Sequence, residues 1–184
     1  FGLVELRISF RMVSFSFFGL NHLEPTGSGR ATPTSTFQHR TGHHPFHRGD
    51  YAEAAKWDRL AADQGDAFGQ ARLGFLYQKG LGVAKNYPEA LKWYRRAAAQ
   101  GNANAQSGLG FMYEKGMGVA KDYQRALAWY RKAAAQGDAS GQSGIGFIYF
   151  RGLGVNKDYA EALKWHRKSA AQGYASGQAG LGIL

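Results

Sequence analysis

Cysteine is absent from the 184 residues of this chain, and acidic side chains are scarce, with 13 Asp and Glu against 23 Lys and Arg. The absence of cysteine excludes disulfide bonds, thiolate metal sites and a cysteine nucleophile. No run of apolar residues reaches the roughly 18 that a membrane-spanning helix needs. The net charge of +10 favours acidic partners, which include acidic proteins, nucleic acid and anionic membrane surfaces.

Repetition dominates the sequence. The four tryptophans are spaced 36 residues apart, and tyrosine, glycine and glutamine recur at the same period. The recurring positions are Trp57, Trp93, Trp129 and Trp165, with Tyr51, Tyr87, Tyr123 and Tyr159, Gly65, Gly101, Gly137 and Gly173, and Gln70, Gln106, Gln142 and Gln178. A feature that returns at a fixed period is a building block before it is a binding site, so we predict an array of similar units.

Each unit is predicted to contain two helices. The first begins after an N-capping residue, and a Glu follows three positions later in three of the four copies, as in a capping box. The capping residues are Asp50, Asn86, Asp122 and Asp158. In the second copy the apolar residues of 87–98 have helical spacing, and Gly101 is expected to end the helix.

The second helix of each unit is rich in glycine. A glycine inside a helix costs roughly 0.5–1 kcal/mol relative to alanine, so a lone helix of this composition barely forms. We therefore expect neighbouring units to stabilise it, as in a solenoid. We also expect another helix to pack closely on the recurring Gly74, Gly110, Gly146 and Gly182.

The glycine-rich stretch GFLYQKGLGVAKN (74–86) raises the alternative of a phosphate-binding loop. In the later copies Tyr113 and Tyr149 stand where a dinucleotide fingerprint has its third glycine, no strand precedes, and no Gly-Lys-Ser/Thr follows. We therefore assign no cofactor. The glycine at the end of each second helix is expected to cap it, and the glycine two residues later to turn the chain. The cap positions are Gly80, Gly116 and Gly152.

The text ANAQSGLGFMYEKGMGVAKDYQRALAWYRKAAAQG (103–137) resembles the Sel-one-like repeat family, and the resemblance covers about residues 50–184. It implies an all-α, right-handed α/α superhelical solenoid of about three and a half helix-turn-helix repeats, with a truncated last repeat, related to the tetratricopeptide repeats. Members commonly act as adaptors that bind proteins or peptides, and many are bacterial. One cysteine-rich branch has been linked to β-lactam binding. That hydrolase alternative is disfavoured because this chain has no cysteine.

Two sets of positions are candidates for partner binding. One position varies among the copies while its neighbours do not, which favours either a specialised surface or burial between units. The other forms a row of cations, which also suit helix C-termini and can cover apolar surface with their stems. We hypothesise a face that binds an acidic peptide or protein, to which these residues contribute: Tyr94, Arg96, Tyr130, Lys132, His166 and Lys168.

Basic, aromatic repeats also fit a helical repeat protein that binds single-stranded RNA, whose affinity falls steeply with salt. The segment HRTGHHPFH (39–47) contains four imidazoles that suit a metal, but its composition favours a flexible lead-in. Inside the repeats His166 is the single histidine, and no pair of carboxylates recurs on one face. We therefore predict no catalytic residue, no metal ligand and no enzyme activity.

Residues 1–49 do not follow the repeat and are assigned to a separate, non-repeat segment. Apolar and polar residues alternate from Leu6 to Phe17, which is typical of a strand or of a disordered segment. Arg7 and Arg11 precede the apolar stretch 12–20, a weak resemblance to an export signal, and no small-residue cleavage site follows it. The compartment of the protein, cytoplasmic or exported, therefore stays open.

Overall fold

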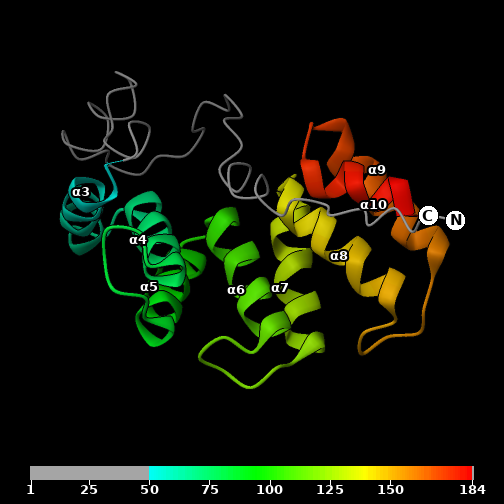
Figure 1. The fold of residues 1–184 in the computed structure, drawn as a ribbon, viewed down its shortest axis with the longest axis horizontal. Coiled ribbons are helices and arrows are strands. Elements are labelled where there is room, and N and C mark those ends of the chain that lie inside the picture. The colour runs from blue at the N-terminus through cyan, green and yellow to red at the C-terminus, as the bar shows by residue number, and fades with distance from the viewer. Residues whose placement is uncertain (1–49, 184) are drawn as a thin grey trace, which may run out of the picture.

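The computed structural model describes residues 50–183, and these form eight α-helices and no strand (Figure 1). The helices are α3 (Tyr51–Asp63), α4 (Ala67–Lys79), α5 (Tyr87–Ala99), α6 (Ala103–Lys115), α7 (Tyr123–Ala135), α8 (Ala139–Arg151), α9 (Tyr159–Ala171) and α10 (Ala175–Ile183). The predicted all-α chain with two helices per 36-residue unit is confirmed over this range. The predictions for 1–49, including the histidine-rich stretch, lie outside the described residues.

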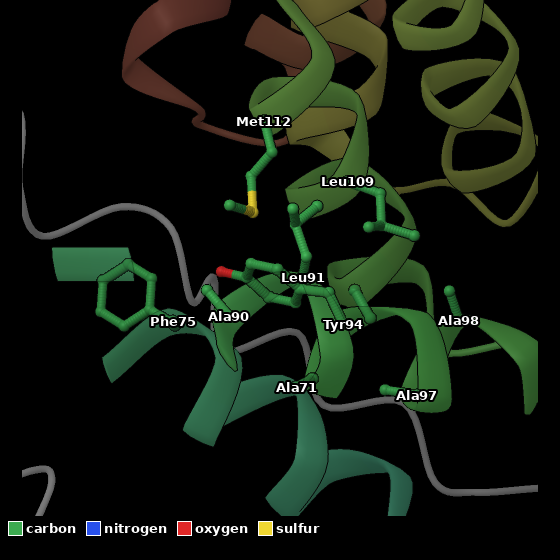
Figure 2. Packing of buried hydrophobic residues seen from close by; sticks show 10 residues of the cluster. Ala71, Phe75, Ala90, Leu91, Tyr94, Ala97, Ala98, Leu109 and Met112 are labelled. Atoms are coloured by element: carbon green, nitrogen blue, oxygen red, sulfur yellow. The ribbon is translucent and has the colours of Figure 1, made fainter. Parts of the chain in front are cut away.

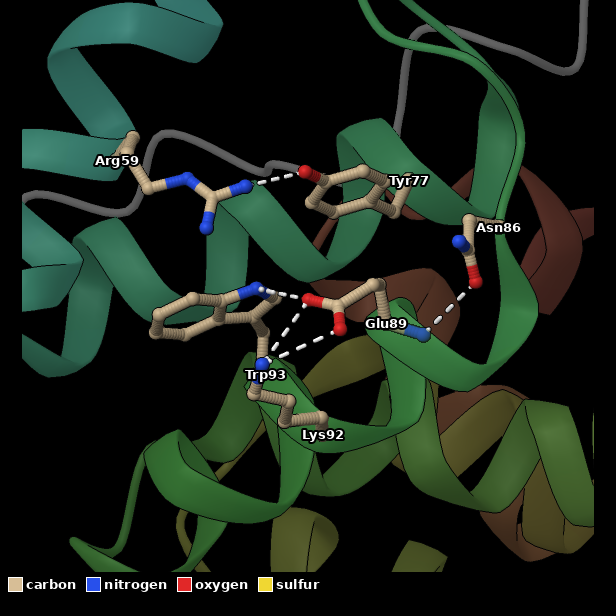
Figure 3. Close-up of polar contacts among 6 residues, drawn as sticks. All are labelled: Arg59, Tyr77, Asn86, Glu89, Lys92 and Trp93. Carbon is tan, nitrogen blue, oxygen red and sulfur yellow. Dashed lines mark hydrogen bonds and ion pairs between the residues drawn. The ribbon is translucent and has the colours of Figure 1, made fainter.

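The first helices α3, α5, α7 and α9 begin where the sequence predicts. In each, the backbone N–H of the third helical residue donates to the side chain of the capping residue, at 2.9–3.1 Å. The Glu at that position does not complete a capping box. In α5 the Glu89 carboxylate instead accepts from the Trp93 indole nitrogen at 3.2 Å and pairs with Lys92 at 3.2 Å (Figure 3).

The second helices α4, α6 and α8 end at glycines with positive φ, as predicted. Gly80, Gly116 and Gly152 have φ between 66° and 73°, the left-handed region that only glycine adopts readily. Gly118 then turns the chain back onto α5, so closely that an added Cβ would lie 2.8 Å from the Cβ of Tyr87. Val119 packs on the core beneath this turn.

Consecutive helices pack against one another along the whole described chain, and the helix pairs follow one another along its long axis (Figure 1). The second helices also contact each other directly, α4 with α6, α6 with α8, and α8 with α10. The largest core cluster unites successive units, because Tyr94 packs among Ala71 of α4 and Leu109 and Met112 of α6 (Figure 2). The fold is an α/α solenoid whose core is shared between repeats.

The glycine-rich character of the second helices has a direct structural cause. The Tyr94 ring of α5 lies between α4 and α6, and a Cβ added at Gly74 or Gly108 would come within 2.8 Å of that ring. The Tyr130 ring lies in the same way between Gly110 and Gly144, 2.6 Å from an added Cβ on either side. The predicted close approach of another helix is confirmed at Gly74, Gly110 and Gly146, the last of which lies against His166. The prediction is wrong at Gly182, where an added Cβ would meet nothing within 4 Å.

The recurring glutamines also join neighbouring units. Gln100, at the end of α5, donates its amide to the Gln70 side chain of α4 at 2.8 Å. The equivalent pairs are Gln136 with Gln106 at 2.8 Å and Gln172 with Gln142 at 2.9 Å. Because Gln70, Gln106 and Gln142 are buried, the hydrogen bonds from the exposed glutamines satisfy groups that packing removes from water.

Candidate functional site

The position that varies among the repeats is buried in the structure and does not lie on the surface. Tyr94, Tyr130 and His166 are 1%, 2% and 4% exposed. The Tyr94 hydroxyl donates to Gln78 Oε1 at 2.8 Å, and the Tyr130 hydroxyl donates to Glu114 Oε2 at 2.8 Å. Burial raises the pKa of both hydroxyls well above the ordinary value. The hypothesis that these three side chains form part of an exposed face is therefore corrected, because the glycine-lined gaps between second helices enclose them.

The first repeat replaces the ring and glycine arrangement with an ion pair. Asp58 occupies the variable position, is fully buried and accepts from Arg72 Nε at 2.8 Å. Later repeats have glycine at the position of Arg72, where an added side chain would strike the ring. Sequence reasoning missed this pair. The signal was that both residues depart from their columns in the same repeat.

His166 occupies the same position in α9. Its ring lies against Gly146 of α8 and Gly180 of α10, and its Nδ1 has no hydrogen-bond partner within the described residues. Phe150 stands where Gln78 and Glu114 supply an acceptor in the earlier repeats. Desolvation by burial lowers the pKa of His166 below its ordinary value, because the imidazolium cannot be hydrated there.

The predicted cations of the first helices are exposed, in contrast to the rings. Each lies over the tryptophan three residues earlier, so we define the tryptophan–cation row as the three pairs Arg96 with Trp93, Lys132 with Trp129, and Lys168 with Trp165. The charged groups lie 4.9, 4.3 and 4.8 Å from the ring centroids. These cations are in register on successive first helices, as the sequence predicts.

A second set of first-helix cations contacts tyrosine hydroxyls of the second helices. Arg59 donates to the Tyr77 hydroxyl (Figure 3), and Arg131 donates to the Tyr149 hydroxyl at 3.0 Å. In the repeat between them, Arg95 and then Arg125 act on Tyr113 and lower the pKa of its hydroxyl. Arg59, Arg95 and Arg131 thereby link the two helices of a unit and are less available to a partner.

Between residues 50 and 183 the chain is positively charged, because 18 Lys and Arg side chains outnumber eleven Asp and Glu side chains. Between residues 50 and 183, ten of the eleven Asp and Glu side chains accept a hydrogen bond or form an ion pair, Asp63 being the exception. In contrast, the ion pairs of this range involve five of its 18 Lys and Arg residues. Arg96, Lys132 and Lys168 are not among the five.

The second helices carry another row that the sequence analysis did not identify. Lys79 Nζ lies 5.9 Å from the ring centroids of both Phe75 and Phe111, and Lys115 Nζ lies 5.6 Å from Phe111 and 5.4 Å from Phe147. Arg151 is the next residue at this position. We define the Phe–Lys row as Lys79, Phe111, Lys115, Phe147 and Arg151. Its signal in the sequence was a basic residue four positions after each recurring phenylalanine.

The described chain holds neither a cluster of three metal-ligating side chains nor a helix long and apolar enough to cross a membrane. Its distinctive features are two periodic rows of cations and aromatic rings on the two sets of helices. Together with the shared core, they define the chain as an α/α solenoid repeat protein.

A family model of the Sel1 repeat matches residues 39–66, 67–102, 103–138 and 139–174, and the chain belongs to this family. The matches 67–102, 103–138 and 139–174 each hold a second helix and the first helix that follows it, such as α4 and α5 in 67–102. Four repeats are thus matched, and the first match begins at residue 39, ahead of the boundary predicted at residue 50. Sel1 repeat proteins are generally scaffolds for protein–protein interaction.

Solved structures share the fold. A Sel1 repeat protein from Oxalobacter formigenes is 38% identical, with a TM-score of 0.70 over 82% of this chain and 62% of its own. A protective antigen present in uropathogenic Escherichia coli strains is 38% identical, with a TM-score of 0.69 over 82% of this chain and 32% of its own. The chain therefore spans less than two thirds of the length of either relative.

Helicobacter pylori cysteine rich protein B is 26% identical, with a TM-score of 0.55 over 73% of this chain and 95% of its own. That protein's name describes it as cysteine rich, whereas the present sequence contains no cysteine. A search of curated proteins found no match.

Proposed function

We propose that this chain is a non-catalytic scaffold, and that an acidic segment of a partner protein binds the tryptophan–cation row. The observation that carries the proposal is that most carboxylates of the described residues already have hydrogen-bond or ion-pair partners, whereas most cations form no ion pair. Arg96, Lys132 and Lys168 are exposed and in register, and none of them forms an ion pair within the described residues. Such a surface attracts an acidic partner and orients it along the array.

The tryptophan rings hold the charged side chains of the tryptophan–cation row in place. A cation over an indole ring at an exposed site gains about 0.5–1 kcal/mol, which restricts the otherwise mobile Lys and Arg side chains. Less conformational entropy is then lost when a carboxylate binds. Three restrained cations on successive helices thus favour a partner whose carboxylates are spaced along an extended segment.

The proposal is tested by capturing binding partners from nuclease-treated bacterial lysate with the full chain as bait. Reversal of the three cations (Arg96→Glu, Lys132→Glu, Lys168→Glu) is expected to abolish capture of partners that the parent retains. The matched control reverses three exposed loop lysines of the same period, Lys85, Lys121 and Lys157. Unchanged capture by the first variant, or equal loss in both, contradicts the assignment. Partners that vanish on nuclease treatment point instead to the RNA alternative.

A further inference from the structure

The Phe–Lys row lies on a different set of helices from the tryptophan–cation row. It crosses α4, α6 and α8, which contact one another directly. Lys79 reaches from α4 toward Phe111 of α6, and Lys115 reaches from α6 toward Phe147 of α8. The row therefore continues across the junctions between repeats, and each lysine lies between consecutive rings.

The row is basic and free of exposed carboxylates. Lys79, Lys115 and Arg151 are exposed, whereas the rings of Phe111 and Phe147 are half-buried. The three helices contain a single acidic residue, Glu114, which is buried and engaged by Tyr130 and Lys115. Charge complementarity therefore selects a ligand with carboxylates, and the alternation of cations with rings selects apolar groups between those carboxylates.

The spacing of the row restricts the conformation of such a ligand. Helices in direct contact have axes about 8–10 Å apart, so we expect successive cations to recur at about that interval. A polyproline II helix rises about 3.1 Å per residue with three residues per turn, so every third side chain lies on one side at intervals of about 9 Å. A β-strand does not match, because its same-side residues recur at about 6.6 Å.

We propose that the Phe–Lys row is a second binding site, which takes a polyproline II segment of a partner protein with a carboxylate at every third residue. The carboxylates pair with Lys79, Lys115 and Arg151, and the intervening prolines pack on Phe111 and Phe147. Lys115 already pairs with Glu114 at 2.6 Å, and its ammonium group has further N–H donors for a ligand carboxylate. Aromatic surfaces suit this ligand because the polyproline II conformation is already extended and loses little entropy on binding. The site goes beyond the first-helix surface and gives the scaffold a separate place for another partner.

The test uses the full chain and a fluorescein-labelled peptide of five Glu-Pro-Pro units, with binding followed by fluorescence anisotropy in about 50 mM NaCl, where surface charges are weakly screened. A control peptide of identical composition places its five glutamates together ahead of ten prolines. We expect the periodic peptide to bind at least fivefold more tightly. Equal affinity for the two peptides, or no binding of the periodic peptide, overturns the proposal.

Variants locate the site. Lys79→Gln, Lys115→Gln and Arg151→Gln together are expected to weaken binding tenfold or more. The matched triple Arg96→Gln, Lys132→Gln and Lys168→Gln makes the same change in net charge and is expected to retain affinity for this peptide. An equal effect of the two triples overturns the proposal, as does tighter binding of a 15-residue oligouridylate than of the periodic peptide.

A ring variant tests the aromatic contribution without removing charge. Phe111→Leu with Phe147→Leu retains apolar packing and the three cations, and is expected to weaken binding of the periodic peptide at least threefold while leaving the helical circular dichroism unchanged. Unchanged affinity in this folded variant overturns the role assigned to the rings. These outcomes do not depend on the tryptophan–cation row. Partner capture with the triple glutamate variant of Arg96, Lys132 and Lys168 tests that row separately.

Discussion

Tyr94 and Tyr130 occupy the same position in successive repeats, but their hydroxyls meet acceptors of different charge. Tyr94 donates to the neutral amide of Gln78, whereas Tyr130 donates to the carboxylate of Glu114, which also pairs with Lys115 at 2.6 Å. A hydrogen bond between neutral groups contributes about 0.5–1.5 kcal/mol, and one to a charged group about 1.5–3 kcal/mol. The two junctions therefore differ in their dependence on one hydroxyl.

We predict that Tyr130→Phe lowers the free energy of unfolding by about 1.5–3 kcal/mol, because the buried Glu114 carboxylate loses its tyrosine donor. Tyr94→Phe is the matched control and is expected to cost about 1 kcal/mol, since only a neutral acceptor is left. Urea-induced unfolding followed by circular dichroism measures both. A greater loss in Tyr94→Phe would contradict the charged character of the second junction.

The buried imidazole of His166 makes stability depend on pH. Because burial lowers its pKa below the ordinary 6.5, the unfolded chain binds a proton first as the pH falls below 6.5. Stability is therefore expected to fall from pH 6.5 down to the folded-state pKa of His166, and to be unaffected by this residue above pH 7.5. Urea unfolding at pH 7.5, 6.5 and 5.5 measures the slope.

The double variant His166→Tyr with Phe150→Gln serves as the control for this slope. It rebuilds the tyrosine–glutamine pair seen between Tyr94 and Gln78 and removes the group that titrates. Histidines outside the repeats are present in both proteins, so the difference between the slopes isolates His166. Parallel pH profiles in parent and variant would show that His166 is not desolvated in the folded chain.

At the scale of the element, the second helices trade intrinsic helix stability for close packing. Each glycine that faces a ring weakens the isolated helix, yet it lets two second helices enclose the ring of the first helix between them. The cost of roughly 0.5–1 kcal/mol per glycine is offset by burial of the whole tyrosine side chain, worth about 1.5–3 kcal/mol for a large side chain.

Gly108→Ala in α6 is predicted to destabilise the chain by about 1–3 kcal/mol, although alanine is the better helix former. Its Cβ would lie 2.8 Å from the Tyr94 ring, which is fully enclosed and has no space to move. Gly182→Ala in α10 is the control, since an added Cβ there meets nothing within 4 Å. Thermal unfolding is expected to occur at a lower temperature in the first variant and at an unchanged or slightly higher one in the second.

Local chemistry sufficed to predict these elements. The N-caps, the left-handed glycines and the close approach at Gly74 depend on residues that recur in every copy, so each copy supports the same conclusion. The fate of the Glu89 carboxylate was not predictable in the same way. The backbone N–H of Asn86, which a capping box would engage, donates instead to the Tyr77 carbonyl of α4 at 2.9 Å, and the Glu89 carboxylate accepts from the Trp93 indole.

At the scale of the whole molecule, stability is a sum of repeats and the contacts between neighbours. Trp93 is 1% exposed between two units, whereas Trp57 in the first described helix is 37% exposed. Within α10 the sole buried residue is Gly177. The array is therefore packed most extensively at its centre.

We predict that amide hydrogen exchange of the 184-residue chain is slowest in α5 to α8 and faster in α3 and α10, because the outer helices have fewer packed neighbours. Hydrogen exchange followed by mass spectrometry at peptide resolution measures the gradient. Uniform protection across all eight described helices would show that the array unfolds as one unit instead.

The candidate sites were less predictable than the array. Tyr94 and Arg96 are two residues apart on α5, and the sequence alone did not separate the enclosed side chain from the exposed one. The enclosure depends on Gly108, which comes from the next repeat and becomes a neighbour only when the units stack. The Phe–Lys row was overlooked for the same reason, since Lys79 and Phe111 meet across a junction 32 residues apart.

The equivalence of the ring-and-glycine junctions has a consequence for how the gene can change in length. Removing residues 87–122 would bring Tyr130 opposite Gly74, with Gly144 on its other side, and Asn86 would cap the helix that begins at Tyr123. The ring-and-glycine contact and the N-cap are thereby replaced by contacts of the same kind, while the Tyr130 hydroxyl would meet the amide of Gln78 in place of the Glu114 carboxylate. Recombination between the repeated coding segments can therefore shorten or extend the protein in steps of 36 codons and retain the packing of the array.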